Sequence, residues 1–232
     1  MPLILALETS ADVCAAALVA DGETLGVRQI EMSRGHAEAL VPMVQDLARE
    51  TGVALMALDL VGVTRGPGSF TGVRTGIAAA RGFSIASGAT AVGVSSLKAV
   101  AEGAAGVLST PTSILCILDT RRSDYFAQIF DPTGAELSAP RVMNGEELWA
   151  LINSEQPILA GNAIKKLLSG QHGDPETIQQ IPGAGNPDPV DVATIAETIL
   201  YKKEGLAEAT LTPLYLRAPA AKLPANGGRL KR

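Results

Sequence analysis

Aromatic residues and cysteines are scarce in this chain of 232 residues. Aromatic side chains make up only 3% of the sequence, so the interior has to be built from smaller aliphatic residues, a composition typical of buried strands covered by small-residue helices. The two cysteines, Cys14 and Cys116, each lie in an apolar run, which favours buried thiols over a disulfide or a metal site. The composition therefore predicts an α/β protein of a reducing compartment, the cytoplasm.

The sequence also lacks a stretch suited to a membrane or to secretion. The opening segment is apolar, but Glu8 interrupts it and no Lys or Arg precedes Arg28. The run from Thr75 to Ser96 is only weakly polar, but Arg81 and several glycines lie in its middle and make it unsuited to a membrane. With 47% hydrophobic and 19% charged residues, the chain is expected to be a soluble globular protein without a membrane partner.

Charge is distributed unevenly along the chain. Residues 217–232 carry five basic residues and no acid, so the total of −5 leaves −10 on residues 1–216. An acidic body repels phosphate backbones, so any contact with nucleic acid is expected through a partner or through this basic end. The Pro, Ala and Gly content of residues 218–232 predicts a flexible basic tail.

The order of predicted elements is that of a ribonuclease H-like lobe. Three strands in a meander precede a helix that ends at Gly52, and strand, glycine-rich loop, helix, strand and helix follow, in the order βββαβαβα. We predict a first lobe over residues 1–105 and a smaller second lobe over residues 106–217. No second glycine-rich loop occurs in the latter, which indicates a reduced lobe.

An internal repeat supports two related lobes. Leu7-Glu8-Thr9 recurs as Leu118-Asp119-Thr120, and in both places an apolar strand meets a carboxylate and a threonine, passes a polar turn and re-enters a strand. Two lobes that open in this way are the signature of the actin-like ATPase (ASKHA) superfamily, in which a nucleotide lies between the lobes. The sequence therefore predicts this duplicated α/β fold.

The repeat suggests where phosphates and a metal ion would lie. The candidates are oxygen-bearing side chains of the two hairpins, because such groups can hold a magnesium-bound phosphate through water: Glu8, Thr9, Ser10, Asp12 and Asp119. The alternative, slightly favoured for the first hairpin, is that these are solvated turn residues. Asp119 has a further alternative, a salt bridge with Arg121 or Arg122.

The glycine-rich segment Arg65–Gly72 allows two interpretations. Its glycines permit close backbone approach and its hydroxyls can cap the next helix, so it can cradle an anion; it can equally be a tight strand-to-helix turn. It lacks the lysine of a Walker loop. The residues that would form the cradle are Gly66, Gly68, Ser69, Thr71 and Gly72.

Catalytic and metal-binding residues are not evident. His36 has Leu40 where a second helical histidine would be needed, and the other histidine is His172, so capping or packing is the favoured role of His36. The serines Ser69, Ser95 and Ser96 have no evident His and acid partners, which gives hydrolase chemistry little support. We predict no catalytic residue and no metal site of the chain's own.

Several segments together resemble one bacterial family, TsaB (YeaZ), whose members act in tRNA threonylcarbamoyladenosine biosynthesis. The resemblance covers about residues 3–217 and is carried by ILALETS, HAEALVPMV, RGPGSFTGVRTGIAAARGFSIA, GVSSLKAVA, LDTRRSDYFAQIF and PLYLR. It implies a non-catalytic subunit in the formation of N6-threonylcarbamoyladenosine at position 37 of tRNAs that read codons beginning with adenine. One departure is Glu8, where the family usually has Asp.

The resemblance also implies partners. Catalysis would belong to a TsaD-like subunit with a pair of metal-binding histidines, a TsaE-like ATPase would join them, and ATP, Mg²⁺ and threonylcarbamoyl-adenylate would be used by the complex, with tRNA bound through it. A homodimer is possible without the partner. The competing functions are an autonomous small-molecule kinase or ATPase of the same fold and, with less support, a glycoprotease-like hydrolase.

Helical spacing suggests a partner interface on the helix after the glycine loop. Small residues around one aromatic share a face there, which lets another helix approach closely: Gly72, Gly76, Ala79, Ala80 and Phe83. The family pairs through first-lobe helices, which adds Leu40, Val44 and Leu47. The alternative is that the strip packs on the chain's own sheet and leaves Val73, Ile77 and Ser84 outside.

Overall fold

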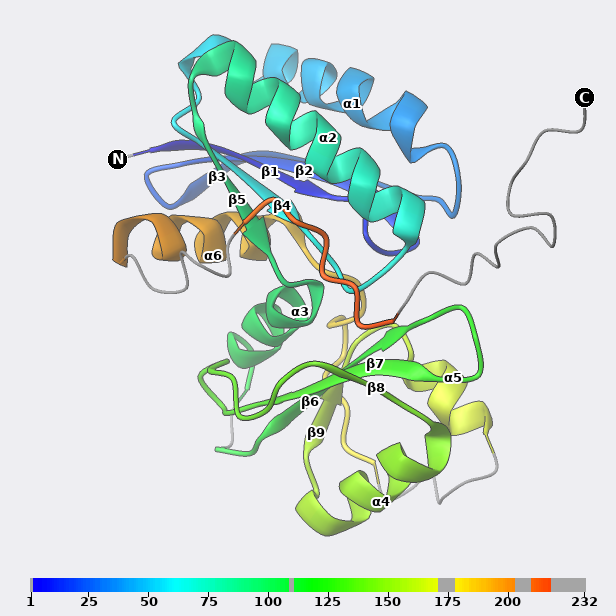
Figure 1. Cartoon of the computed structure of the whole chain (residues 1–232). Coiled ribbons are helices and arrows are strands. Elements are labelled where there is room, and N and C mark those ends of the chain that lie inside the picture. Colours follow the sequence, from blue (N-terminus) through cyan, green and yellow to red (C-terminus); the bar gives the residue numbers. More distant parts are fainter. Residues whose placement is uncertain (1, 109–110, 171–177, 203–209, 218–232) are drawn as a thin grey trace, which may run out of the picture.

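The chain forms two α/β lobes, one above the other in Figure 1. The structure, a computed structural model, describes residues 2–108, 111–170, 178–202 and 210–217. The strands form a sheet of five in the order β3-β2-β1-β4-β5 and a sheet of four in the order β8-β7-β6-β9. Their bounds are β1 Leu3–Glu8, β2 Val13–Ala20, β3 Glu23–Glu31, β4 Leu60–Thr64, β5 Thr90–Val94, β6 Ile114–Asp119, β7 Tyr125–Phe130, β8 Arg141–Met143 and β9 Ile158–Ala160.

Six α-helices and one short 3-10 helix are seen in the described part of the chain. Their bounds are α1 His36–Thr51, η1 Leu55–Ala57, α2 Phe70–Ser87, α3 Ser96–Ala105, α4 Gly145–Glu155, α5 Ile164–Ser169 and α6 Pro189–Lys202. The predicted order βββαβαβα of the first lobe is confirmed, with η1 inserted before β4. Within these residues no helix has the length and apolarity needed to cross a membrane.

Strand β1 is apolar on both sides because both faces of the first sheet are covered. Leu5 and Leu7 pack with residues of α1 and α2, while Ile4 and Ala6 pack with residues of α6. The strand pairs antiparallel with β2 and parallel with β4. Figure 1 shows α1 and α2 on one side of this sheet and α6 on the other.

The second sheet repeats the opening of the first. Strands β6 and β7 form an antiparallel hairpin, and β9 joins β6 in parallel, as β4 joins β1. Helices α4 and α5 pack on one face and α3 on the other. The duplicated fold with a smaller second sheet therefore agrees with the sequence prediction.

Helix α6 requires a correction to the predicted lobe boundaries. The prediction assigned residues 106–217 to the second lobe, but α6 packs on β1, β2 and β4 of the first sheet. Val192 and Ala196, one turn apart, form its contact surface, and they cover the side of β1 that would otherwise be exposed. The chain therefore returns to the first lobe after completing the second. The predicted tail, residues 218–232, lies outside the described residues, as does His172.

Candidate functional site

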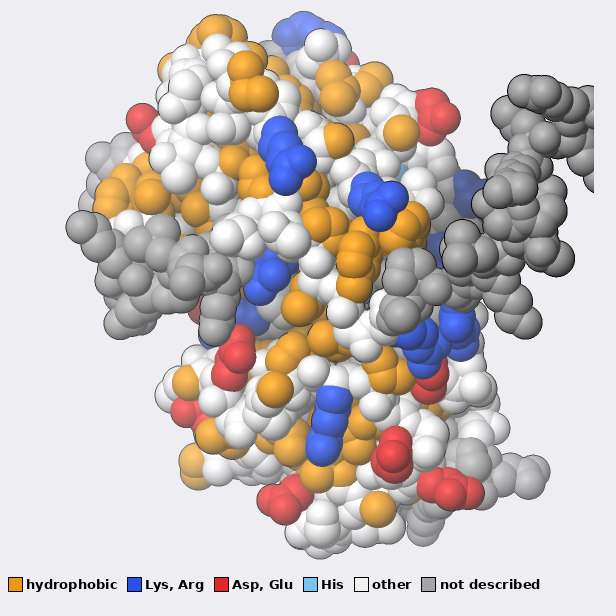
Figure 2. Space-filling view, viewed as in Figure 1, with side chains coloured by type: hydrophobic (Ala, Val, Ile, Leu, Met, Phe, Trp, Pro, Cys, Tyr) orange, Lys and Arg blue, Asp and Glu red, His pale blue; other side chains and the backbone are white. Residues whose placement is uncertain are grey.

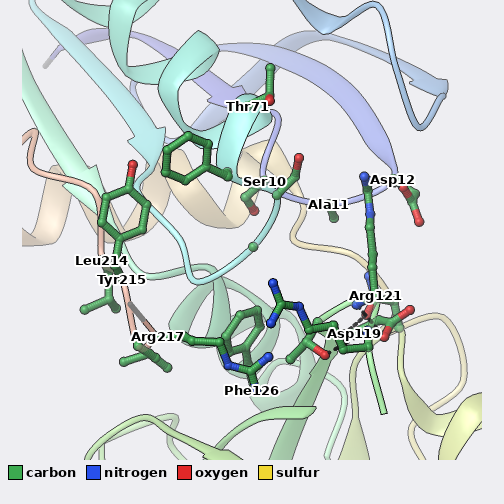
Figure 3. A pocket seen from close by; sticks show the side chains of 17 residues that line it. Ser10, Ala11, Asp12, Thr71, Asp119, Arg121, Phe126, Leu214, Tyr215 and Arg217 are labelled. Atoms are coloured by element: carbon green, nitrogen blue, oxygen red, sulfur yellow. Dashed lines mark hydrogen bonds and ion pairs between the residues drawn. The ribbon is translucent and has the colours of Figure 1, made fainter. Parts of the chain in front are cut away.

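A cleft of about 540 Å³ lies between the two lobes (Figure 3). Its walls come from the turn after β1, the glycine loop with the start of α2, the turn after β6, and a segment far along the chain. These are residues 10–12, 68–71, 119–122 and 214–217. The two repeated hairpins thus face each other across the cleft, as the predicted fold requires.

Glu8 ends β1 but does not line the cleft. Its side chain is fully buried, and Oε1 accepts hydrogen bonds from Ser10 N (2.6 Å), Ser10 Oγ (2.8 Å) and Ala11 N (2.9 Å). The carboxylate therefore closes the turn of its own hairpin. The expectation of solvated residues is wrong for Glu8, Thr9 and Ser10, which are all buried, because the turn folds back beneath the glycine loop.

Burial also changes the acidity of Glu8. Desolvation raises the pKa of Glu8 from 4.5 to about 7, against hydrogen bonding from Thr64, Ser10 and Ala11, which favours the anion. Among the described residues, neither Glu8 Oε2 nor Thr64 Oγ1 has a partner of good hydrogen-bond geometry. Ser10 Oγ lies 2.7 Å from Ser96 Oγ and links this cluster to α3. Glu8 is thus a buried, weakly acidic group of the first lobe.

The glycine loop packs against the first hairpin. A Cβ at Gly68 would lie 2.2 Å from Ser10 O, and one at Gly72 would lie 1.9 Å from Thr9 O. Ser69 N donates to Ser10 O (2.7 Å), and Thr9 Oγ1 donates to Gly72 O (2.8 Å). The tight-turn interpretation thus accounts for these two glycines, since only glycine allows the backbones so close. Ser69 also caps α2 by accepting from Gly72 N (3.3 Å).

Gly66 and Thr71 have other positions. Gly66 has a positive φ of 100° where the chain leaves β4. Thr71 is exposed and lines the cleft together with Gly68 and Ser69. The loop therefore presents hydroxyl groups to the cleft, while its glycines hold it against the first hairpin.

The acidic residues of the cleft are already paired with cations of the chain. Lys166 Nζ lies 2.5 Å from Asp119 Oδ1, and Arg121 forms an ion pair with Asp12 across the two lobes (Figure 3). The predicted neutralisation of Asp119 by Arg121 or Arg122 is wrong, because the Arg121 side chain extends to the other lobe. Its backbone N–H, however, donates to Asp119 Oδ1 (2.9 Å).

The sequence of this chain is similar to those of several known proteins. The family described as "TsaD: tRNA N6-adenosine threonylcarbamoyltransferase" matches residues 20–221. The tRNA threonylcarbamoyladenosine biosynthesis protein TsaB of Escherichia coli (strain K12) is 34% identical over 154 residues, which are 66% of this chain and 63% of that protein. TsaB of Haemophilus influenzae is 33% identical over 127 residues, 54% of this chain and 53% of that protein. The matches thus span less than two thirds of these curated relatives.

A solved structure, YeaZ from Pseudomonas aeruginosa, has a TM-score of 0.73 and 26% identity, and the match covers 93% of this chain and 100% of that one. The chain belongs to the TsaD family, in its TsaB (YeaZ) group. A dehydratase activator from Clostridium difficile and a glucomannokinase from Arthrobacter match with TM-scores of 0.54 and 0.55 at 12% identity, a likeness of fold alone. The predicted actin-like ATPase fold is therefore confirmed.

The predicted interface residues of this TsaB-group chain are mostly core. Six of the eight are buried against the chain's own sheet or first hairpin: Leu40, Val44, Leu47, Gly72, Gly76 and Ala80. Ala79 and Phe83 are half-buried. The expectation of an exposed strip is wrong because most of it packs inward. The alternative, that the strip packs on the chain's own sheet, is correct for these residues but wrong in leaving Val73 and Ile77 outside, since both are buried.

The outward surface of α1 and α2 carries a different apolar groove of about 550 Å³. Figure 2 shows hydrophobic side chains with basic ones between them over this part of the first lobe. The groove is lined by Ala37, Leu40, Val41, Phe70, Thr71, Arg74, Thr75, Ala78 and Ala79. Of the eight predicted interface residues, Leu40 and Ala79 line this groove and the other six do not.

Two partners of the cleft residue Asp119 had no signal in the sequence. Lys166 reaches Asp119 from α5, and Asn162 Oδ1 accepts from Asp119 N (2.9 Å). Both lie more than forty residues from Asp119 in an ordinary helix-and-turn segment. His36 begins α1 and is buried, which agrees with the packing interpretation.

Proposed function

We propose that this chain takes part in forming N6-threonylcarbamoyladenosine at position 37 of tRNAs that read codons beginning with adenine, as a non-catalytic subunit. It pairs with a TsaD-like transferase and assembles with a TsaE-like ATPase. Membership of the TsaD family and likeness to curated TsaB proteins support the pathway. The non-catalytic role is supported by one observation above all, the engagement of the cleft carboxylates Asp12 and Asp119, and of the buried Glu8, by the chain's own groups.

That observation bears on nucleotide binding in the following way. A magnesium-bound nucleotide needs carboxylate oxygens that are free to accept metal-bound water. Here Glu8 is turned into its own hairpin, Asp119 is paired with Lys166, and Asp12 is paired with Arg121. Binding Mg-ATP would require breaking these contacts. ATP, Mg²⁺ and threonylcarbamoyl-adenylate are therefore assigned to the partners, and tRNA is bound through the complex.

The α1–α2 groove is the partner surface under this proposal. Val41 and Phe70 are 40% and 45% exposed, and Ala78, in the middle of α2, is exposed as well. Small and apolar side chains at such positions allow a helix of another subunit to approach closely. Arg74 lies at the rim, where it would meet polar groups of the partner. A second copy of the chain could occupy the same groove when the transferase is absent.

The pairing test uses two matched substitutions on α2. Ala78→Glu places a charge in the groove, whereas Ala86→Glu places the same charge on an exposed residue outside it. We expect Ala78→Glu to weaken association with the TsaD-like subunit by about tenfold or more, because the charge would be desolvated and unpaired, and Ala86→Glu to have little effect. Size-exclusion chromatography with light scattering measures association, and circular dichroism confirms folding. A folded Ala78→Glu protein that pairs normally would remove the groove from the proposal.

The catalytic assignment has its own test. The isolated chain should form no threonylcarbamoyladenosine from threonylcarbamoyl-adenylate and tRNA, and product should form when the TsaD-like subunit is added. Calorimetry with Mg-ATP separates this proposal from the kinase or ATPase alternative, because an autonomous enzyme should bind at micromolar concentrations. Product formation by the chain alone, or tight nucleotide binding with turnover, would overturn the non-catalytic role.

A further inference from the structure

Residues 210–217 cross the face of the first lobe and end at the second lobe (Figure 1). Leu214 N donates to Arg65 O (2.7 Å), and Arg81 Nη2 donates to Leu211 O (2.9 Å). A Cβ at Gly66 would lie 3.1 Å from Leu214 O, so the segment fits closely against the start of the glycine loop. Backbone groups of an extended segment are thus bound by a strand end and a helix of the first lobe.

Tyr215 is the anchor at the rim of the cleft. Its ring stacks on Phe70 with centroids 5.4 Å apart, and its hydroxyl oxygen accepts from Arg74 Nε (2.8 Å). The Arg74 guanidinium lies 3.8 Å from the Phe70 ring centroid. Aromatic stacking and cation–π contact therefore join these three side chains into one cluster.

Arg217 connects the segment to the second lobe. It forms an ion pair with Asp124, and both side chains are at least two-thirds buried. Asp124 Oδ1 also accepts from Thr120 Oγ1 (2.6 Å) in the turn after β6. Residues 214–217 line the cleft, so the segment bridges the lobes beside it, in addition to the Asp12–Arg121 pair.

Phe70 belongs both to this bridge and to the groove. It lines the cleft beside Tyr215, and it lines the α1–α2 groove beside Arg74. A change that releases Tyr215 would free the Phe70 ring and the Arg74 side chain at the groove rim. Ordering those side chains would then cost conformational entropy when a partner binds.

We propose that residues 210–217 form a strap that holds the two lobes closed over the cleft, and that seating of the strap and docking of a partner in the α1–α2 groove favour one another. The second part rests on the proposed function. Coupling of this kind is reciprocal, so partner docking should protect the strap to the same extent that the strap strengthens docking.

The first experiment uses the isolated chain and therefore does not depend on the proposed function. Amide hydrogen exchange is followed in residues 211–217 and 119–125 for Tyr215→Ala, Tyr215→Phe and Tyr201→Ala, an exposed tyrosine of α6. We expect Tyr215→Ala to speed exchange in both segments by about tenfold or more, since release of the strap opens the second-lobe turn as well. Tyr215→Phe, which keeps the aromatic stack, should show exchange rates close to those of the unaltered chain. Tyr201→Ala should show the same exchange rates as the unaltered chain. Faster exchange confined to residues 211–217 would overturn closure of the lobes.

The second experiment measures affinity for the TsaD-like subunit with the same variants. Loss of the aromatic stack in Tyr215→Ala should weaken association about threefold to tenfold, and Tyr215→Phe should restore most of it. Association should also slow exchange of residues 211–217 in the unaltered chain. Equal affinities, or an unprotected strap in the complex, would overturn the coupling. If the TsaD-like subunit does not bind at all, the coupling falls together with the proposed function, while the isolated-chain experiment still decides the strap.

Discussion

Replacing Glu8 with Gln removes a buried charge while keeping the shape of the side chain. The Gln Oε1 atom can accept the hydrogen bonds that Ser10 and Ala11 now donate to Glu8, and its amide group can donate to the buried Thr64 hydroxyl, which favours the Glu8 anion in the unaltered chain. We therefore expect Glu8→Gln to fold normally. Its free energy of unfolding should differ from that of the unaltered chain in a way that depends on pH.

The sign and size of this dependence follow from the pKa of Glu8. Burial raises the pKa from 4.5 to about 7, so the folded chain holds the proton more tightly than the unfolded chain does. The stability contributed by the protonated group is complete below pH 4.5 and is lost as the pH rises through 7. A rise of about 2.5 units corresponds to about 3 kcal/mol in total, of which about 2.5 kcal/mol is lost between pH 5 and pH 8.

Urea denaturation of both proteins at pH 5, 6, 7 and 8 measures this difference. The stability of Glu8→Gln relative to the unaltered chain should increase by about 2–3 kcal/mol from pH 5 to pH 8 with unchanged urea slopes. Burial also raises the pKa of Asp191 to about 7, but Asp191 is present in both proteins and cancels in the comparison. Glu23→Gln, at an exposed position of β3, is the matched control. A difference that stays constant with pH would refute the argument that burial keeps Glu8 weakly acidic.

Three further changes test the packing of the first lobe and the charge of the tail. Gly72→Ala should lower the free energy of unfolding by about 3 kcal/mol or more, because the new Cβ would lie 1.9 Å from Thr9 O. Thermal denaturation measures this, and a small shift in melting temperature would show that the loop can move aside. Ala80→Glu buries an unpaired charge beneath α2 and should abolish the folded circular dichroism spectrum, which a folded variant would contradict. Deleting residues 218–232, which lie outside the described residues, should flatten the salt dependence of tRNA binding by the complex without affecting pairing, and an unchanged salt slope would count against a role in tRNA contact.

Local patterns in the sequence predicted most of the fold. Alternating apolar strands, glycine stops and the recurrence of Leu7-Glu8-Thr9 at Leu118-Asp119-Thr120 predicted the order of elements and the two related hairpins. These signals are reliable because strand alternation, helical spacing and turn chemistry depend on neighbours along the chain. The partners in space were not predictable in the same way. Helix α6 shows this, since its apolar spacing was visible but the sheet that it covers was not.

The site shows the same division more sharply. The sequence by itself determined which residues stand at the ends of β1 and β6 and that a glycine-rich turn follows β4. Only the tertiary structure decided that Glu8 is sealed inside its hairpin, that Asp119 pairs with Lys166, and that Arg217 reaches Asp124. Periodicity shows that residues share a face of a helix or strand, but it does not show what covers that face. Burial and long-range ion pairs depend on which elements meet after the chain has folded, and these set the acidity of Glu8 and the cations that face the cleft.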